Sequence, residues 1–350
     1  MKKYIGLFNY FVYIEMQNEV LELFRFYLGD YYEFRDELDG EQIVIGTVKV
    51  CNDDLKYEER IEKYITSPQR HIIMKKGKYK DNRVVAIEYL GEKNRVFWIE
   101  KCKLFYEVDD EKKIINIVSN QEVLQKKEIV ILIRNQILCA YFEMKGGIKF
   151  HSSIITNRKQ EGIVFCGPSG AGKTTAYLCA VGSKKFLPHT SDKALISSRN
   201  GQLYAYCIPN QIRVLKGVFQ ATKKDFLKEC TEINMEDKQE KITFNWRDLY
   251  DLYDVTDIEP VVKIKKIIQL RYDDSIEEII DKKIEGTEKE NIIDLNILTG
   301  KDLDEEPMWL GWYMPMNNNQ VADQMSLTEV REIRWPSIEK LKEYIYYLED

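Results

Sequence analysis

The sequence predicts a mixed α/β protein of the α+β kind, with a small β-rich module over residues 1–120 and an α/β domain over residues 121–350. Three observations lead to this fold class. Short segments rich in β-branched and aromatic residues fill the first part of the chain. Further on, an apolar segment leads into a glycine-rich loop that precedes a helical pattern. A hairpin directly before this loop differs from a parallel βαβ unit and therefore predicts a mixed sheet.

The composition is that of a globular protein with room for two domains. The 350 residues are 44% hydrophobic and 31% charged, and the formal net charge of −6 argues against a nucleic-acid partner. The seven cysteines are scattered and form no Cys-x-x-Cys pair. This pattern indicates reduced thiols in a cytoplasm, and neither a disulfide framework nor a zinc site.

The N-terminal segment imitates a signal peptide only in part. Two lysines precede the apolar residues 4–14, but Asn9 interrupts this run and Glu15 ends it without a small-residue cleavage site. We expect a β-strand or a strand pair here. No apolar run reaches the length of about 18 residues that a membrane span needs. We therefore expect a cytoplasmic protein without a membrane partner.

In the β-rich module we expect one helix and five strands. The helix is predicted at 20–28, and the strands at 42–50, 84–90, 95–99, 104–108 and 114–118. Residues 121–145 have apolar side chains at three- and four-residue spacing, which predicts an amphipathic helix that ends at Gly146-Gly147. We expect this helix to pack against the sheet of the α/β domain.

The predicted elements of the α/β domain follow one another closely around the loop. We expect strands at 149–155 and 162–166, a turn at 157–161 between them, and a helix at 174–181. Further strands are predicted at 191–196, 203–208 and 261–270, and helices at 222–230, 276–284 and 337–347. Segment 302–324 contains Trp309, Trp312, Met308, Met314 and Met316 without periodicity. It is either a lid or recognition surface, or an irregular packed segment.

Residues 167–174 read Gly-Pro-Ser-Gly-Ala-Gly-Lys-Thr, a complete P-loop (Walker A) fingerprint. Glycines let backbone N–H groups converge on a phosphate, and the helix that follows adds the positive end of its dipole. Lys173 can reach the β/γ-phosphates, and the Thr174 hydroxyl can bind Mg²⁺. We therefore expect ATP or another nucleoside triphosphate, with Mg²⁺, to be bound by Gly167, Pro168, Ser169, Gly170, Ala171, Gly172, Lys173, Thr174 and Thr175. The alternative is a glycine-rich turn that binds nothing.

Two classes of P-loop protein do not fit this chain. A transporter ATPase carries a Leu-Ser-Gly-Gly-Gln signature, which the sequence lacks, and an apolar strand that ends in Asp-Glu, which segment 267–273 imitates only weakly. A guanylate kinase places its loop near the start of a compact domain, whereas here the loop follows a β-rich region.

The order of residues around the loop resembles the HPr kinase/phosphorylase family and its relatives of the phosphoenolpyruvate-carboxykinase-like fold. Members have a His that opens the strand before the loop strand, a Gly-x-Ser-Gly-x-Gly-Lys-Ser/Thr loop, and an acidic pair after the loop helix. His151, Ser169 within the loop, and Asp192 match these places in residues 127–200. Lys193 stands where a second acid is usual, and the Glu-Leu-Arg-Gly-Leu-Gly segment of true HPr kinases is absent. The chain therefore resembles a divergent relative.

Relatives in peptide-maturation gene clusters phosphorylate a precursor peptide. The resemblance thus implies a Mg²⁺- and ATP-dependent kinase that transfers the γ-phosphoryl group to a hydroxyl, Ser or Thr, of a peptide or small-protein acceptor. It implies catalytic roles for Asp192, His151 and Lys173, with Thr174 and Asp192 at the metal. A strand after the loop helix would return Asp192 beside the loop, where a carboxylate can accept the hydroxyl proton. The alternatives are a turn cap for Asp192 and a half-buried strand histidine for His151.

Two other functions stay open from the sequence. One is a nucleotide-gated binding module, in which bound nucleotide orders segment 302–324 for a protein partner. The other is a plain P-loop NTPase without an acceptor. Arg213 and Arg271 are either phosphate contacts or members of surface ion pairs. The sequence does not decide between a monomer and a homo-oligomer.

Overall fold

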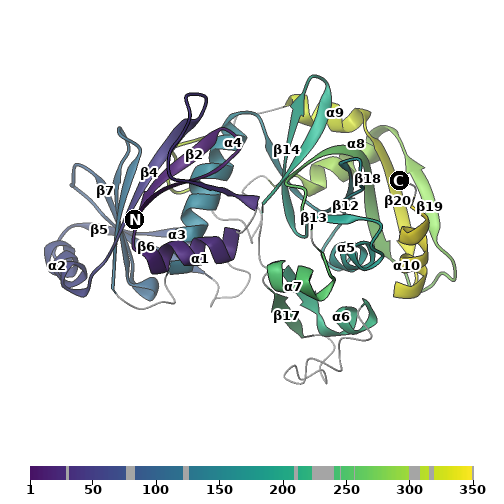
Figure 1. Cartoon of the computed structure of the whole chain (residues 1–350), viewed down its shortest axis with the longest axis horizontal. Coiled ribbons are helices and arrows are strands. Elements are labelled where there is room, and N and C mark those ends of the chain that lie inside the picture. Colours follow the sequence, from purple (N-terminus) through teal and green to yellow (C-terminus); the bar gives the residue numbers. More distant parts are fainter. Residues whose placement is uncertain are drawn as a thin grey trace. The chain divides into compact units, whose positions relative to one another are not determined.

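The computed structural model describes residues 1–28, 31–75, 83–120, 126–208, 212–222, 240–244, 246–255, 257–298, 308–314 and 319–348. These residues form a mixed α/β protein with two compact units (Figure 1). Unit 1 comprises residues 1–145 and 299–316, and unit 2 comprises residues 146–298 and 317–350. The division after residue 145 differs from the boundary near residue 120 that the sequence predicted. No helix in the described ranges is long and apolar enough to cross a membrane.

Among the described residues, unit 1 has a nine-stranded sheet in the order β3-β1-β2-β4-β9-β8-β7-β6-β5. Its strands are β1 (Lys2–Leu7), β2 (Tyr10–Glu15), β3 (Glu33–Arg35), β4 (Ile43–Asn52), β5 (Gln69–Lys75), β6 (Val84–Tyr89), β7 (Arg95–Ile99), β8 (Leu104–Asp109) and β9 (Ile114–Ser119). Strand β4 is parallel to both of its neighbours, β2 and β9. The N-terminal strand pair and the five strands expected from the sequence are present, whereas β3 and β5 were not predicted.

The helices of unit 1 include the predicted one and a longer segment of mixed geometry. They are α1 (Asn18–Leu28), α2 (Asp54–Tyr64), the 3₁₀ turn η3 (Glu100–Cys102), α3 (Lys126–Ile131), the π-helix η5 (Leu132–Cys139) and α4 (Ala140–Met144). Gly146, at φ 93°, ends the last of these as the sequence indicated. The η5 segment contacts β2 and β4 of unit 1. The expectation that this helix covers the sheet of the α/β domain is therefore wrong, because its apolar face is used within unit 1.

Residues 308–314 are packed irregularly within unit 1. The ring of Trp309 stacks on Tyr106 at a centroid distance of 5.7 Å, and the indole N–H of Trp312 donates to Asp110 at 2.8 Å. Arg95 donates to the same carboxylate and to the backbone carbonyls of Trp309 and Leu310. Burial alone raises the pKa of Asp110, but the hydrogen bonds from Arg95 and Trp312 outweigh it and hold this pKa below its usual range. Met316 and residues 302–307 of the predicted segment lie outside the described residues.

Unit 2 is built on a second mixed sheet, whose main path within the described residues is β10-β14-β15-β18-β12-β11-β13, with β20 paired to β18 and β19 paired to β20. Its strands are β10 (Ile148–His151), β11 (Ser153–Thr156), β12 (Glu161–Cys166), β13 (Leu187–Thr190), β14 (Lys193–Arg199), β15 (Gln202–Cys207), β18 (Val261–Tyr272), β19 (Ile280–Ile284) and β20 (Glu329–Trp335); β16 (Ile212–Leu215) and β17 (Lys241–Phe244) form a separate ribbon. Strand β12 lies between antiparallel β11 and parallel β18. The mixed sheet expected from the hairpin before the loop is confirmed.

Helices cover both faces of this sheet (Figure 1). The helices of unit 2 are α5 (Lys173–Gly182), α6 (Lys216–Thr222), α7 (Trp246–Leu252), α8 (Gly286–Asn296), α9 (Asn319–Leu327) and α10 (Ile338–Tyr347). Of these, α6 and α7 contact the β16–β17 ribbon. Helices α5 and α10 pack on each other, while Ile293 of α8 and Met325 of α9 join Val164 of β12 in one buried core cluster. The predicted C-terminal helix is present, with Ser337 as its N-cap.

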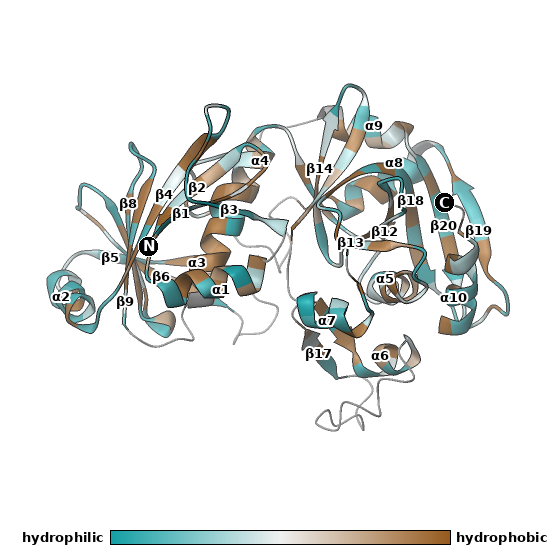
Figure 2. Cartoon of the chain, viewed as in Figure 1, coloured by the Kyte–Doolittle hydropathy of each residue, from teal (hydrophilic) through white to brown (hydrophobic). Residues whose placement is uncertain are grey.

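Two predicted elements of unit 2 take another form. Residues 276–284 were expected to be a helix, but β19 runs antiparallel to β20 there, and Figure 2 shows it in hydrophilic colours. Four of its five residues are exposed, and Asp281 accepts from Arg331 of β20 at 2.6 Å. Pairing with β20 thus outweighs the local helix pattern. The predicted strand 149–155 is divided at Ser152 into β10 and β11, which pair with different strands. Most of the predicted helix 222–230 lies outside the described residues.

A buried histidine on β13 leads to a prediction about how the stability of the protein depends on pH. His189 is fully buried, its Nδ1–H donates to the carbonyl of Glu259 at 2.6 Å, and its Nε2 has no hydrogen-bond partner in the described part of the chain. Burial lowers the pKa of His189 from 6.5 to about 4. Between pH 6.5 and 4, the unfolded chain therefore binds a proton at His189, whereas the folded chain keeps this histidine neutral. Stability is retained above pH 6.5 and falls by about 3 kcal/mol as the pH drops from 6.5 to 4.

Urea unfolding of the His189→Gln variant at pH 7 and pH 4.5 measures this contribution. We expect the variant to lose less stability between these two pH values than the parent does. His71→Gln, at an exposed position of β5, is the matched control. Between the two pH values it should lose as much free energy of unfolding as the parent does. Equal losses for the parent and His189→Gln would contradict the assignment of this pH dependence to His189.

Candidate nucleotide-binding site

The glycine-rich loop (Gly167–Gly172) connects β12 to α5, so the strand and the helix expected on either side of the fingerprint are both present. Strand β12 is buried from Gly162 to Cys166 and runs parallel to β18, which in turn runs parallel to β20. The loop therefore lies at the carboxyl ends of three parallel strands. In α/β proteins this edge of a sheet is where ligands bind.

Three glycines of the loop, among them Gly167 with a φ angle of 132°, have backbone conformations that other residues rarely adopt. Gly170 and Gly172 have φ angles of 87° and 98°. Alternation of left- and right-handed residues directs successive N–H groups into one concavity, which is the usual anion-binding arrangement of such loops. Helix α5 begins at the next residue, Lys173, and its first N–H groups have no acceptor within the helix. The backbone of this region can therefore hold an anion.

Lys173 is a buried cation without an ion-pair partner among the described residues. Its Nζ donates to the carbonyls of Gly167 at 2.7 Å and Pro168 at 3.1 Å, and the residue is 9% exposed. Burial lowers the pKa of Lys173, and the charge of Asp192 partly offsets this effect. A buried ammonium that is held only by neutral oxygens is costly, and a nearby anion would relieve that cost.

The structure brings Asp192 and His151 together. His151 ends β10 and pairs with Lys193 of β14, so that its Nε2 lies 3.8 Å from Oδ1 of Asp192. Hydrogen bonds hold the backbone of residues 190–193: Ser152 N–H donates to the Asp192 carbonyl, Ser153 Oγ to the Ser191 carbonyl and Thr190 Oγ1 to the Lys193 carbonyl. None of these three bonds uses the Asp192 carboxylate. That side chain is 44% exposed and can therefore meet a substrate.

The remaining predicted site residues lie on α5, on the β16–β17 ribbon and on β18. Thr174 is half-buried in the first turn of α5, beside the buried Thr175. In the described ranges no group of three or more His, Cys, Asp or Glu residues could hold a metal ion, and the roles of Thr174 and Asp192 at Mg²⁺ stay predictions. Arg213 is exposed on the β16–β17 ribbon. Arg271 is exposed near the end of β18, opposite Arg334 in register.

Two buried residues at the loop were missed from the sequence. The side-chain oxygen of Asn296, the last residue of α8, accepts from the Gly167 N–H at 3.1 Å, and its NH₂ group donates to the Ile292 carbonyl at 2.7 Å. The indole N–H of Trp335, the last residue of β20, donates to the Ala171 carbonyl at 3.0 Å. Neither belongs to the fingerprint, and both lie far from it in sequence, so no local signal could have identified them.

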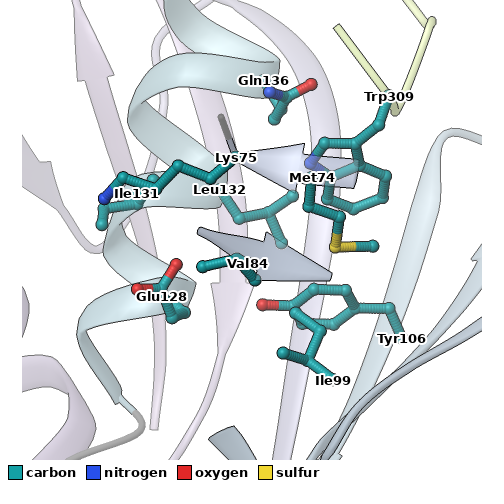
Figure 3. Close-up of a pocket in the computed structure, with 10 residues that line it drawn as sticks. All are labelled: Met74, Lys75, Val84, Ile99, Tyr106, Glu128, Ile131, Leu132, Gln136 and Trp309. Atoms are coloured by element: carbon teal, nitrogen blue, oxygen red, sulfur yellow. The ribbon is translucent and has the colours of Figure 1, made fainter. Parts of the chain in front are cut away.

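A pocket within unit 1 lies between the sheet and the α3–η5 segment (Figure 3). Apolar side chains such as Met74, Val84 and Leu132 and the stacked rings of Tyr106 and Trp309 form most of its wall. Its polar lining residues are Lys75, Glu128 and Gln136.

No protein-family model matches the chain, and neither does any curated protein. Among solved structures, the Hpr(Ser) kinase/phosphatase from Coxiella burnetii matches with 14% sequence identity and a TM-score of 0.30. The match covers 57% of this chain and 92% of that chain. A similarity this weak carries no argument about fold or function.

Two matched substitutions test the packing of the loop. Gly170→Ala and Gly172→Ala each add a methyl group at a residue with positive φ, which costs about 1–2 kcal/mol in either case. No heavy atom beyond the neighbouring residues lies within 4 Å of a Cβ built on Gly170, whereas on Gly172 it would lie 2.3 Å from Cζ2 of Trp335. We expect Gly172→Ala to lower the free energy of unfolding by about 1–3 kcal/mol more than Gly170→Ala, because the indole must move. Equal losses in urea denaturation would contradict this packing.

Proposed function

We propose that unit 2 binds Mg·ATP at the glycine-rich loop and transfers the γ-phosphoryl group to a Ser or Thr hydroxyl of a peptide or small protein. The observation that carries the proposal is Lys173, a buried ammonium beside N–H groups of the loop and of the first turn of α5. Cation and amides together provide positive potential where the fingerprint expects phosphate. The exposed carboxylate of Asp192 lies close enough to act on the pKa of Lys173.

Each residue has a defined task in this reaction. Phosphoryl transfer has a loose transition state, so the protein contributes mainly charge stabilisation and in-line positioning. Lys173 and the loop amides would bind the β- and γ-phosphate oxygens, and Thr174 and Asp192 would hold Mg²⁺, which neutralises phosphate charge. The Asp192 carboxylate accepts the proton of the acceptor hydroxyl as its oxygen bonds to the γ-phosphorus and ADP leaves. His151, 3.8 Å from that carboxylate, orients it.

The structure offers less support for the nucleotide-gated binding module. In that function, bound nucleotide orders the Trp- and Met-rich segment 302–324 for a protein partner. Trp312 is 8% exposed and bonded to Asp110, and the ring of Trp309 stacks on Tyr106. Both indoles therefore make their contacts within unit 1. A plain NTPase remains the second candidate, and the transfer experiment below distinguishes it.

The first prediction concerns binding. Lys173→Met keeps the aliphatic stem but removes the charge, so we expect the stabilisation of the folded protein by Mg·ATP to disappear. At 100 times the Kd, that stabilisation is about 2.7 kcal/mol for the parent. Thermal unfolding with and without Mg·ATP measures it. Lys265→Met, which removes a surface lysine paired with Glu161 at 3.0 Å, is the control and should retain the full effect. Full stabilisation of Lys173→Met would refute the phosphate site.

The second prediction concerns transfer. Asp192→Asn should still bind the nucleotide through Lys173 and the loop amides, but it should transfer phosphate about 10²–10⁴-fold more slowly, because the proton acceptor is lost. The assay uses γ-labelled ATP with Ser- and Thr-containing peptides encoded beside the gene. Asp254→Asn, at a surface carboxylate paired with Lys184, should transfer at the parent rate. A transfer rate equal to the parent's in Asp192→Asn would contradict the mechanism. Label found only in free phosphate would indicate the plain NTPase.

A further inference from the structure

Trp335 holds the glycine-rich loop from outside the fingerprint. It is 5% exposed, and its ring lies against Gly172 while its Nε1–H donates to the Ala171 carbonyl at 3.0 Å. Tyr272, its register partner on β18, lies against it at a ring-centroid distance of 4.8 Å. The indole therefore lies between the β18–β20 strand pair and the loop.

The hydrogen bond from Trp335 sets the direction of one peptide group. The peptide between Ala171 and Gly172 is trans, so its C=O and N–H point in opposite directions. Because the carbonyl points to the indole, the N–H of Gly172 points away from it. The N–H of Ala171 donates to the Pro168 carbonyl and that of Gly167 to Asn296, so these two amides are already used within the protein. Gly172 thus presents its N–H directly before the first turn of α5.

We propose that Trp335 is a positioning residue for phosphate binding, which keeps the 171–172 peptide in the orientation that lets the Gly172 N–H donate to a phosphate oxygen. This inference rests on the proposed function. Ala171 is 4% exposed, so its carbonyl needs a donor from the protein. Without the indole N–H, rotation of the peptide toward another donor becomes favourable. The apparent affinity then falls in proportion to the fraction of molecules in the binding orientation.

The test is the Kd of the full chain for Mg·ATP, measured by titration calorimetry. We expect Trp335→Phe to raise this Kd about tenfold, which corresponds to about 1.4 kcal/mol. Trp312→Phe is the matched control: it also removes a buried indole donor, the one bonded to Asp110, and should leave the Kd unchanged. Trp fluorescence adds a readout of whether Trp335 lies at the occupied site. The change in emission on adding Mg·ATP should persist in Trp312→Phe and disappear in Trp335→Phe.

A second variant keeps the test valid if Trp335→Phe does not fold. Benzothienylalanine at position 335 preserves the shape of the indole and replaces its N–H by sulfur, so it should fold and still bind about tenfold more weakly. Parental affinity in this variant would overturn the inference and leave the proposed function intact. Absence of Mg·ATP binding in the parent would refute the proposed function itself, and the inference with it.

Discussion

The arrangement of the site depends on how the buried residues of the glycine-rich loop, Gly167 and Ala171, find hydrogen-bond partners for their backbone. Pro168, Ser169 and Gly170 in the middle of the loop are exposed, but water cannot freely satisfy the polar groups of the buried Gly167 and Ala171. The loop supplies one internal bond, from Ala171 N–H to the Pro168 carbonyl, and Asn296 and Trp335 supply two more from other elements. These elements can reach the loop because β20 runs parallel to β18 and α8 packs on the same core as β12. The conformation of a local sequence motif is therefore a property of the whole sheet.

This dependence also explains the electrostatics of Lys173. A loop stabilised by distant residues can direct two carbonyls, those of Gly167 and Pro168, at the lysine ammonium. Carbonyl oxygens hold a cation in place without neutralising it, and burial accordingly lowers the pKa of Lys173 despite the charge of Asp192. Under the proposed function, this uncompensated ammonium would favour a polyanionic ligand over a neutral one.

The parts of the fold that the sequence predicted are those set by local pattern. Strand β12, helix α5 and the antiparallel strand before the loop follow from apolar runs, glycines and a short turn, and all three are present. Helix α2 was missed, although Asp53 caps it by accepting from Lys56 N–H at 3.1 Å. Its buried residues, Tyr57 and Tyr64, lie among many charged residues and so give only a weak apolar pattern. Strand β19 was mistaken for a helix because its pairing with β20 is decided by tertiary contact.

The same distinction separates the predicted site residues from the missed ones. Lys173 and His151 stand out by motif or resemblance, whereas Asn296 and Trp335 are ordinary residues whose role arises from where a helix and a strand end. Composition left residues 308–314 open between a recognition surface and an irregular packed segment. Exposed tryptophans would indicate a recognition surface, yet Arg95 and Asp110 bind this segment through its carbonyls and an indole N–H. A polar network of this kind satisfies buried donors and acceptors and so makes a tryptophan-rich segment part of a core.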